Sequence, residues 1–455
     1  MNLYLSHSTA LRFWRSWSAA AAVPLHAFHD LGAAEAALFP DRFFAASEVL
    51  FRAVRTDREI REALRRAAAP GDPSAASAAE KGADPAASVV PAAVAPRVPA
   101  AVVPAAATSR ASSLGVAAAT APGVPAADAA SASDAMPATG AVAVALRTAC
   151  CSDGDPVHVV TTSCGGLRNS TAATRHRIGG ALPRGSFLKV APGVFVCSPE
   201  LVFVQMAASV PRGALLALGY ELCGCYPVGG DRAGALVRRP LTAPRRLSAF
   251  AARATGLTGV TAARAAAKRV LAKSGSIMET EVSIVAFSSV AQGGLGLVPP
   301  KLNEPVTLSA RAKEATGLSR VVCDWLWPEA RVAVEYDGRD SHASPQQQAR
   351  DARKRDALRI DGFDLTVITS SQFHHVTQCT ALLLGVGRRV GPRKRKLSAE
   401  HVPRHLTLRK QVRAPSRAFP LSLQEEPLVE PVLLTGSHPV ISLFFVEFGE
   451  MRQIG

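Results

Sequence analysis

The feature that most limits how this chain can fold is a long segment without large side chains. Residues 67–146 contain no Phe, Tyr, Trp, Cys or His and consist mostly of Ala, Pro, Ser, Val and Gly. Such a segment cannot bury enough apolar surface to offset the entropy lost on ordering. Its Val-Pro-Ala-Ala units favour an extended, semi-rigid conformation. We therefore expect residues 67–146 to be a disordered insertion or linker.

The rest of the chain divides by composition. Residues 1–66 contain aromatic and aliphatic clusters but would be marginal as a domain alone. We expect them to join residues 147–226 in one small mixed N-terminal domain, because a long insertion in a surface loop costs little. Short strands are predicted at HVVTT, SFLKV and GVFVC, followed by a helix capped by Ser198. A basic helical connector is expected at 227–273, a folded domain at 274–390, and a basic, largely disordered tail at 391–455.

The charge balance indicates the class of partner. The 455 residues include 52 Lys and Arg against 36 Asp and Glu, a formal net charge of +16. A polyanion such as DNA is therefore the expected partner. In the connector, Arg245, Arg246, Lys268 and Arg269 are accompanied by almost no acids. They form either a phosphate-contacting surface or a solvated helical face.

Cysteine usage and hydropathy bear on the compartment. Eight cysteines at irregular spacings, without a recognisable secretion signal, favour free thiols in a reducing compartment. No window offers about 18 uninterrupted apolar residues, so no membrane span is expected. The sequence therefore predicts a cytoplasmic protein, and it does not indicate an oligomeric state.

The most informative region begins at Ser276. Ser276 and Glu279 have capping-box spacing and precede an apolar stripe, which predicts a helix over 276–291. The strand-like runs RVVCDWLW and RVAVEYDG follow, joined by a turn at Pro328-Glu329. These runs predict a β-hairpin.

This hairpin would bring Asp324 and Glu335 together. If Trp327 faces Ala330, the two acids are diagonal neighbours with Cβ atoms about 7 to 8 Å apart, and a slip of one pair places them directly opposite. Either register allows both carboxylates to bind one Mg²⁺. The alternative is that both are solvated acids on a half-buried sheet, but each lies in an apolar run where an unpaired charge is costly.

Three segments in this region resemble a nuclease family. METEVSIVAF, CDWLWPEARVAVEYDGRDSH and ARDARKRDALRIDGFDLTVIT are similar to the very-short-patch-repair-like endonuclease domains of the PD-(D/E)XK superfamily. The resemblance covers about a quarter of the chain. It implies a restriction-endonuclease-like α+β fold and hydrolysis of DNA phosphodiester bonds that depends on Mg²⁺ or Mn²⁺.

The resemblance also implies roles for single residues. Asp324 and Glu335 would hold the metal, with the backbone carbonyl of Tyr336 as a third ligand. Asp337 stands where the superfamily often has a lysine, and it is either a turn residue or a ligand. His342 would take part in proton transfer or have a structural role.

Two further positions have both functional and structural explanations. Glu279 matches the first-helix glutamate of these nucleases, but helix capping also explains it. The missing cation would come from Arg350 or Lys354 on a helix at 345–361, unless the cations of that helix pair with Asp351 and Asp356.

The N-terminal half has a looser resemblance. LYLSHSTALRFWR and GVFVCSPELVFVQMA resemble actinobacterial proteins related to abortive-infection antitoxins, which implies a DNA-targeting or regulatory module. Together these features predict a metal-dependent DNA endonuclease, a hydrolase, in phage defence or DNA repair. The alternative is a non-catalytic DNA-binding or antitoxin-like regulator in which the nuclease fold is only a scaffold.

Overall fold

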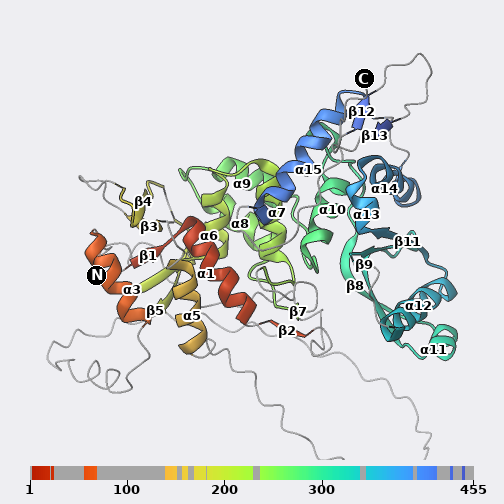
Figure 1. Ribbon diagram of the computed structural model, residues 1–455, viewed down its shortest axis with the longest axis horizontal. Helices are drawn as coiled ribbons and strands as arrows, with labels where there is room; N and C mark the ends of the chain where they lie inside the picture. The colour runs from red at the N-terminus through yellow and green to blue at the C-terminus, as the bar shows by residue number, and fades with distance from the viewer. Residues whose placement is uncertain are drawn as a thin grey trace, which may run out of the picture. The chain divides into compact units, whose positions relative to one another are not determined.

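The protein has a mixed α/β architecture with two larger sheets (Figure 1). The computed structural model describes residues 3–20, 22–24, 56–68, 139–150, 156–161, 169–180, 182–228, 236–338, 345–392, 397–417, 431–433 and 443–445. Both larger sheets combine parallel and antiparallel strand pairs, in agreement with the expected α+β class. Within these ranges, no helix is both long enough and apolar enough to cross a membrane.

The first sheet joins strands from both sides of the Ala/Pro-rich segment. Its order is β4-β3-β1-β6-β5, with β1 parallel to β6 and antiparallel to β3. The strands are β1 (Leu3–Leu5), β3 (Val157–Thr161), β4 (Ala173–Arg177), β5 (Phe187–Ala191) and β6 (Val194–Cys197). The strands predicted at HVVTT, SFLKV and GVFVC are thus present. Because β1 is the central strand, residues 3–5 complete a sheet whose other strands follow more than a hundred residues later.

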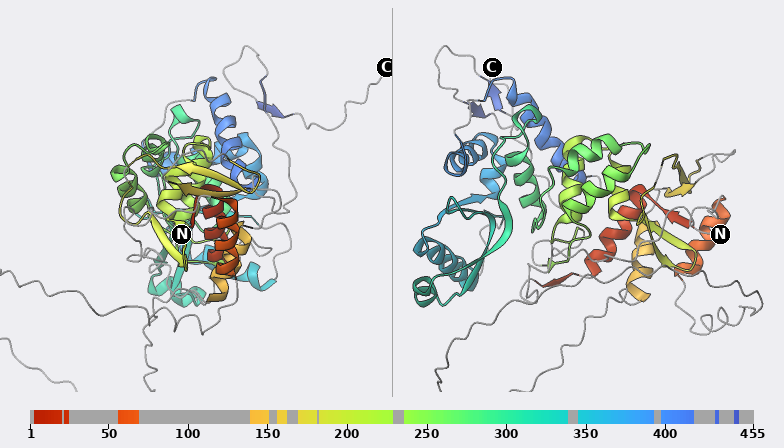
Figure 2. Two further views of the ribbon diagram at one scale, coloured as in Figure 1. Left: turned by 90° about the vertical axis from the view of Figure 1, so that its left-hand side faces the viewer. Right: turned by 180° about the vertical axis from the view of Figure 1, so that it is seen from behind.

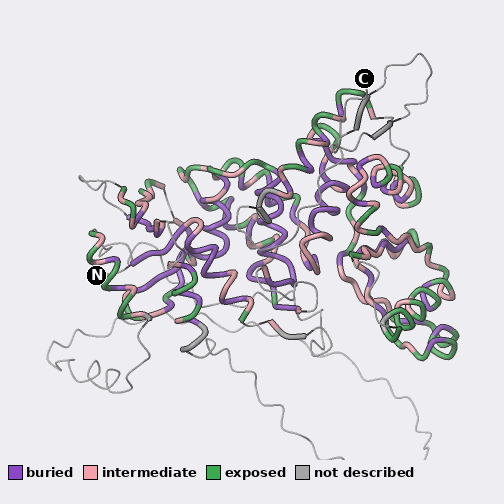
Figure 3. The backbone as a smooth tube through the Cα atoms, in the orientation of Figure 1, coloured by how far each residue is buried: buried purple, intermediate pink, exposed green. Residues whose placement is uncertain are grey.

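Seven helices of the described residues precede, separate or follow the strands of this sheet in the sequence. They are α1 (His7–Ala20), α3 (Asp57–Ala68), α5 (Thr139–Cys150), α6 (Pro199–Met206), α7 (Arg212–Cys223), α8 (Pro244–Arg253) and α9 (Val260–Ala267). A short pair of strands, β2 (Val23–Pro24) and β7 (Leu236–Val237), lies outside the sheet. Ser198 caps α6 as predicted, because its hydroxyl accepts a hydrogen bond from the Leu201 N–H at 3.2 Å. Helix α7 is buried from Gly213 to Cys223 (Figure 3).

Helix α5 corrects the boundary expected at residue 146. It begins at Thr139, inside the segment predicted to be disordered, and Ala145 and Leu146 are 0% and 2% exposed. Arg12 of α1 donates a hydrogen bond to the Ala149 carbonyl at 3.1 Å. Small side chains bury little area themselves, but they allow α5 to pack against α1, which supplies the aromatic side chains. Residues 69–138, where the rest of this prediction falls, lie outside the described residues.

The second sheet has the order β11-β10-β9-β8 (Figures 1 and 2). Its elements are α10 (Ile277–Phe287), the 3₁₀ helix η4 (Val290–Gln292), β8 (Lys301–Thr307), α11 (Ala310–Thr316), β9 (Arg320–Trp327), β10 (Val332–Asp337), α12 (Pro345–Ile360), β11 (Asp364–Thr369), α13 (Ser370–His374) and α14 (Val376–Val390). The β8–β9 and β9–β10 pairs are antiparallel, and the β10–β11 pair is parallel. The predicted hairpin is present.

Two helices cover opposite faces of this sheet. The Trp325 ring N–H donates to the Ser283 hydroxyl of α10 at 3.1 Å. Leu326, the next residue, shares a buried cluster with Ala357 and Leu358 of α12. Because successive strand side chains point to opposite faces, α10 and α12 enclose the sheet between them.

Helix α15 (His401–Arg417) corrects the prediction of a largely disordered tail from residue 391. It contacts α7 and α10, and His401, His405, Leu408 and Val412 are buried on one face. The close approach requires Gly213 on α7, where a Cβ atom would lie 2.7 Å from Cβ of Gln411. The buried residues recur at helical spacing, but the many cations between them obscured this pattern. A short antiparallel pair, β12 (Pro431–Leu433) and β13 (Leu443–Phe445), follows.

We predict that two nested deletions will differ in stability. Replacing residues 70–136 with a Gly/Ser linker should preserve cooperative thermal unfolding, because α3 and α5 pack against each other and residues 70–136 contain no aromatic side chain. Extending the deletion to Leu146 removes the buried Val142, Ala145 and Leu146, so the melting temperature should fall. Equal melting temperatures for the two deletions would contradict the packing of α5.

Candidate functional site

The β9–β10 register places the two predicted acids opposite each other. The ladder pairs are Val332 with Trp327, Ala333 with Leu326, and Val334 with Trp325, so the next position aligns Glu335 with Asp324. The turn spans residues 328–331, and Arg331 adopts a left-handed φ of 49°. This loop is longer than the Pro328-Glu329 turn that the sequence predicted, so Trp327 pairs with Val332 instead of Ala330, two residues further along. The register therefore corresponds to the directly opposed arrangement.

The backbone ladder stops where these acids begin. The last backbone pair is Val334 with Trp325. Beyond it, the Asp324 carboxylate replaces a backbone carbonyl as the acceptor, because its Oδ2 accepts a hydrogen bond from the Tyr336 N–H at 2.7 Å. A buried N–H group needs an acceptor, and here a side chain replaces the strand carbonyl. The half-buried Asp324 carboxylate is thereby fixed next to Glu335.

Lys354 of α12 supplies a cation to this site. Its Nζ donates to Oε2 of Glu335 at 2.5 Å, with side chains that are 24% and 18% exposed. The fully buried Ala357 and Leu358 lie three and four residues later, so Lys354 is on the helix face that packs against the sheet. Arg350, the other residue expected here, is exposed one turn earlier. The alternative pairing with Asp356 is made by Arg359, at 3.1 Å.

Glu279 approaches from the first turn of α10. The Ser276 hydroxyl accepts from the Glu279 N–H at 3.1 Å, which confirms the predicted cap. The Glu279 carboxylate accepts hydrogen bonds from the Gly275 N–H and the Asn303 amide, both at 2.8 Å. A small pocket with about 10 Å³ of space, room for about one water molecule, is lined by Glu279, Val282, Asp324, Trp325, Val334, Tyr336 and Ile368.

Asn303 is a site residue that sequence reasoning missed. The neighbouring pairs of Leu302 with Trp325 and Glu304 with Cys323 place it opposite Asp324 on β8. It adopts a left-handed φ of 46°, and its amide bridges the Lys273 carbonyl and the Glu279 carboxylate, each at 2.8 Å. One row across the sheet therefore contains Asn303, Asp324 and Glu335. No sequence pattern marks Asn303, because its role depends on the β8–β9 register.

Burial and mutual repulsion raise the pKa values of two acids. Burial, then the nearby Asp324, raises the pKa of Glu279 to about 8. The same two causes raise the pKa of Glu335 to about 7, although Lys354 acts in the opposite direction. Burial disfavours the charge on Lys354, but Glu335 and Asp324 outweigh it and raise the Lys354 pKa. Asp324 thus acts on the carboxylates of both Glu279 and Glu335, while Lys354 interacts with Glu335 and Asp324.

The three carboxylates do not form a single compact ligand set. Within the described residues, oxygens of Glu279, Asp324 and Glu335 do not all lie within 4.8 Å of one another. A shared cation would therefore be held by Asp324 and Glu335, which are opposed on the sheet, while Glu279 lies to one side.

The other predicted site residues are placed as follows. His342 lies outside the described residues. Asp337 ends β10 and pairs with Thr369 of β11. Among the connector cations, Arg245, Lys268 and Arg269 are exposed. Arg246 donates to the buried Glu200 at 3.0 Å, which links α8 to α6, and its contact with a phosphate stays a prediction.

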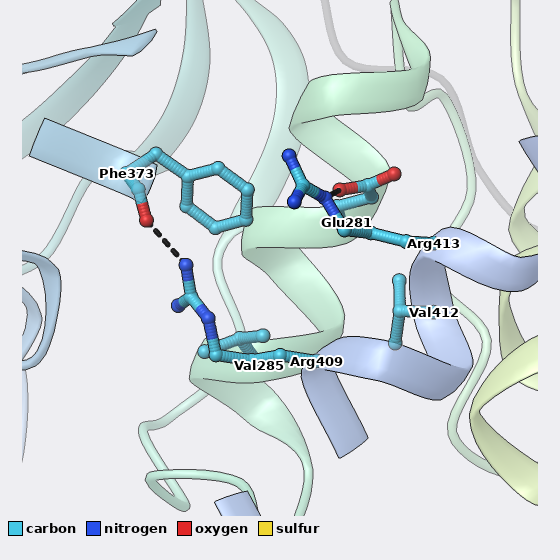
Figure 4. Close-up of a pocket in the computed structure, with 6 residues that line it drawn as sticks. All are labelled: Glu281, Val285, Phe373, Arg409, Val412 and Arg413. Carbon is cyan, nitrogen blue, oxygen red and sulfur yellow. Dashed lines mark hydrogen bonds and ion pairs between the residues drawn. The ribbon is translucent and has the colours of Figure 1, made fainter. Parts of the chain in front are cut away.

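Helix α15 packs against the side of α10 that faces away from Glu279 (Figure 4). Its buried Arg409 donates to the Phe373 carbonyl and lies 4.5 Å from the centre of that ring. Arg413 pairs with Glu281 of α10 at 3.7 Å. Glu281 is two residues after Glu279, about 200° around the helix, so the face opposite the site is held by α15. Phe373 also packs edge-on against Tyr336, with ring centres 6.3 Å apart.

We predict that Glu279→Gln will stabilise the metal-free protein above about pH 4.5. A carboxyl group whose pKa rises from 4.5 to about 8 on folding lowers the stability of the folded state progressively between these pH values, because the unfolded chain releases its proton first. In EDTA, wild type and variant should melt alike near about pH 4, and the advantage of the variant should grow until the pH has passed about 8 and then stay constant. Glu329→Gln, on the exposed turn of the hairpin, is the control. A pH-independent difference would contradict the raised pKa.

Comparison with known proteins does not indicate a function for this chain. No family model, curated protein or solved structure matches this chain. The arrangement of Glu279, Asp324, Glu335 and Lys354 is therefore the basis for inferring a function.

Proposed function

We propose that residues 274–390 form a restriction-endonuclease-like domain that hydrolyses DNA phosphodiester bonds with Mg²⁺ or Mn²⁺. The observation that carries this proposal is the convergence of Asp324, Glu335 and Lys354, with Glu279 beside them, where the hairpin ladder ends. The order of α10, β8, β9, β10, α12 and β11 agrees with the helix, hairpin, helix and strand of the family that the sequence resembles.

The residues at the end of the hairpin fit a hard divalent cation. Among the described groups, none donates a hydrogen bond to the buried Oε1 of Glu335. A buried carboxylate oxygen without a donor is costly, and Mg²⁺ prefers such oxygen ligands. Asp324 and Glu335 would hold the ion, and the Tyr336 carbonyl remains the predicted third ligand. When bound, the ion would neutralise charge on the phosphate and lower the pKa of a water molecule.

The protein's own groups would position the reactants. The Tyr336 N–H fixes the Asp324 carboxylate, and Lys354 orients Glu335 while presenting a positive charge for the phosphate. Glu279 has a pKa near 8 and is held by Asn303 beside Asp324, so it is suited to accept the proton of an attacking water. The water oxygen would bond to phosphorus as one P–O ester bond breaks, leaving a phosphate end and a hydroxyl end.

Exposed cations would hold the DNA backbone. Arg350 lies one turn from Lys354 on the same helix, and Arg245, Lys268 and Arg269 are exposed on the connector. Contacts of this kind release counterions, so DNA affinity should fall steeply with salt.

We predict that removing either hairpin acid will separate binding from cleavage. Asp324→Asn or Glu335→Gln removes a negative charge with little change of shape, so cleavage with Mg²⁺ should be lost while metal-free binding stays equal or becomes tighter. His342→Ala should slow cleavage by roughly 10²-fold if it acts in proton transfer. Supercoiled and single-stranded DNA should be tested with Mg²⁺ and Mn²⁺, and Glu329→Gln is the matched control. Wild-type protein that binds but cleaves neither substrate would favour the regulator.

We predict that Lys354→Met will reduce cleavage by about 100-fold or more at saturating Mg²⁺. Metal affinity should stay equal or increase, because Glu335 loses its competing ammonium partner. Lys354→Arg should retain part of the activity. Arg355→Met removes an exposed cation from the next position of α12 and serves as the control. Full activity of Lys354→Met would show that the ion pair has only a structural role.

A further inference from the structure

Three histidines from separate elements meet at the edge of the N-terminal sheet. His7 begins α1 directly after β1, His158 is on β3, and His176 is on β4. Strands β1, β3 and β4 are consecutive neighbours in the sheet (Figure 1). None of the residues proposed for the nuclease site lies in this region, and the cluster belongs to a different sheet from the hairpin acids.

The strand registers explain why the three histidines lie close together. Leu5 pairs with Val159 in the antiparallel β1–β3 ladder, so His7, just beyond β1, lies at the same end of the sheet as His158. In the parallel β3–β4 ladder Val160 pairs with His176. His158 is two residues before Val160 and therefore points to the same face as His176, one diagonal step away.

The ring nitrogens are close enough to share one ion. His158 Nδ1 lies 2.8 Å from His176 Nε2, and one nitrogen from each of the three rings lies within 4.8 Å of the others. The His7 ring stacks on His176, with centres 3.6 Å apart and planes 22° apart. All three residues are half-buried, so an ion can reach the rings from solvent.

The His7 backbone is held in an unusual conformation. Its φ is 46°, in the left-handed region that non-glycine residues seldom adopt. Its N–H donates to the Gln205 amide oxygen at 3.2 Å, and its Nδ1 lies 3.1 Å from the Ser6 hydroxyl. These contacts leave Nε2 as the nitrogen of His7 that faces the other two rings, by the usual division of roles in a ligating imidazole.

Neutral imidazoles suit this arrangement. An imidazole with an ordinary pKa of about 6.5 is mostly neutral at pH 7 and offers a lone pair on one ring nitrogen. A hydrogen bond between His158 and His176 explains why these two rings are close. It does not explain why the His7 ring is stacked on His176.

We propose that His7, His158 and His176 bind one borderline divalent ion, with Zn²⁺ as the best fit. Zinc–nitrogen bonds of about 2.0 to 2.1 Å at tetrahedral angles require nitrogens about 3.4 Å apart, so the 2.8 Å pair would open by about half an ångström. The stacked His7 ring would also change its tilt, because an ion binds a ring nitrogen in the plane of that ring. Three imidazoles favour Zn²⁺ over Mg²⁺, and the fourth position would hold water. The ion would tie β1 and α1 to β3 and β4, which come from opposite sides of the Ala/Pro-rich segment.

The test measures metal binding by the full chain, in a Glu335→Gln background that weakens the carboxylate site. Titration with Co²⁺ as a spectroscopic substitute should give one tetrahedral site per chain, which Zn²⁺ displaces. His7→Gln, His158→Gln and His176→Gln should each weaken Zn²⁺ binding by at least about 100-fold. His375→Gln, a half-buried histidine at the start of α14, is the matched control and should bind like its parent.

A second measurement avoids dependence on variants that fold poorly. X-ray absorption of the Zn²⁺-loaded protein should show three imidazole ligands, and Zn²⁺ should raise its melting temperature. Fewer than three imidazoles, or unchanged affinity in any of the three single variants, would overturn the proposal. The outcome does not depend on nuclease activity, because the cluster and the hairpin acids prefer different metals and lie on different sheets.

Discussion

The end of the β9–β10 ladder is the constraint on which the candidate site depends. A strand pair that continued past Trp325 and Val334 would use the Tyr336 N–H in a backbone hydrogen bond. Here the Asp324 carboxylate accepts it, so the acid is fixed in a gap between strands instead of extending into water. Its charge then raises the pKa values of Glu279 and Glu335 and of Lys354. The hydrogen bond from the Tyr336 N–H thus fixes Asp324 where its charge affects the pKa values of Glu279, Glu335 and Lys354.

The net charge overstates the number of cations that are free of structural contacts on the protein surface. Arg15 forms a nearly buried two-point ion pair with Glu221, at 2.8 and 2.7 Å, which ties α1 to α7. Arg238 is 2% exposed and donates to three backbone carbonyls. Arg409 fixes α15 to α13 in the same manner. Arginine suits these positions because its planar group satisfies several acceptors at once. Part of the +16 charge therefore stabilises the fold.

The two candidate metal sites differ in ligand chemistry and in how they are built. Asp324 and Glu335 belong to one hairpin, so a local register creates their proximity. His7 lies more than a hundred residues from His158 and His176, so that cluster depends on β1 entering the middle of the sheet. Carboxylates favour a hard ion and imidazoles a borderline one, which allows the two sites to be occupied independently.

The sequence by itself determined the elements whose patterns are local. Apolar runs flanked by a turn predicted the hairpin, Ser276 and Ser198 predicted two helix starts, and the acids inside apolar runs predicted Asp324 and Glu335 as a pair. Tertiary structure decided the rest. The longer turn at 328–331 selected the register, and packing of α12 chose Lys354 over Arg350 as the partner of Glu335. The roles of Asn303, of α5 and of α15 arise from contacts between distant segments, which periodicity and composition within one segment do not encode.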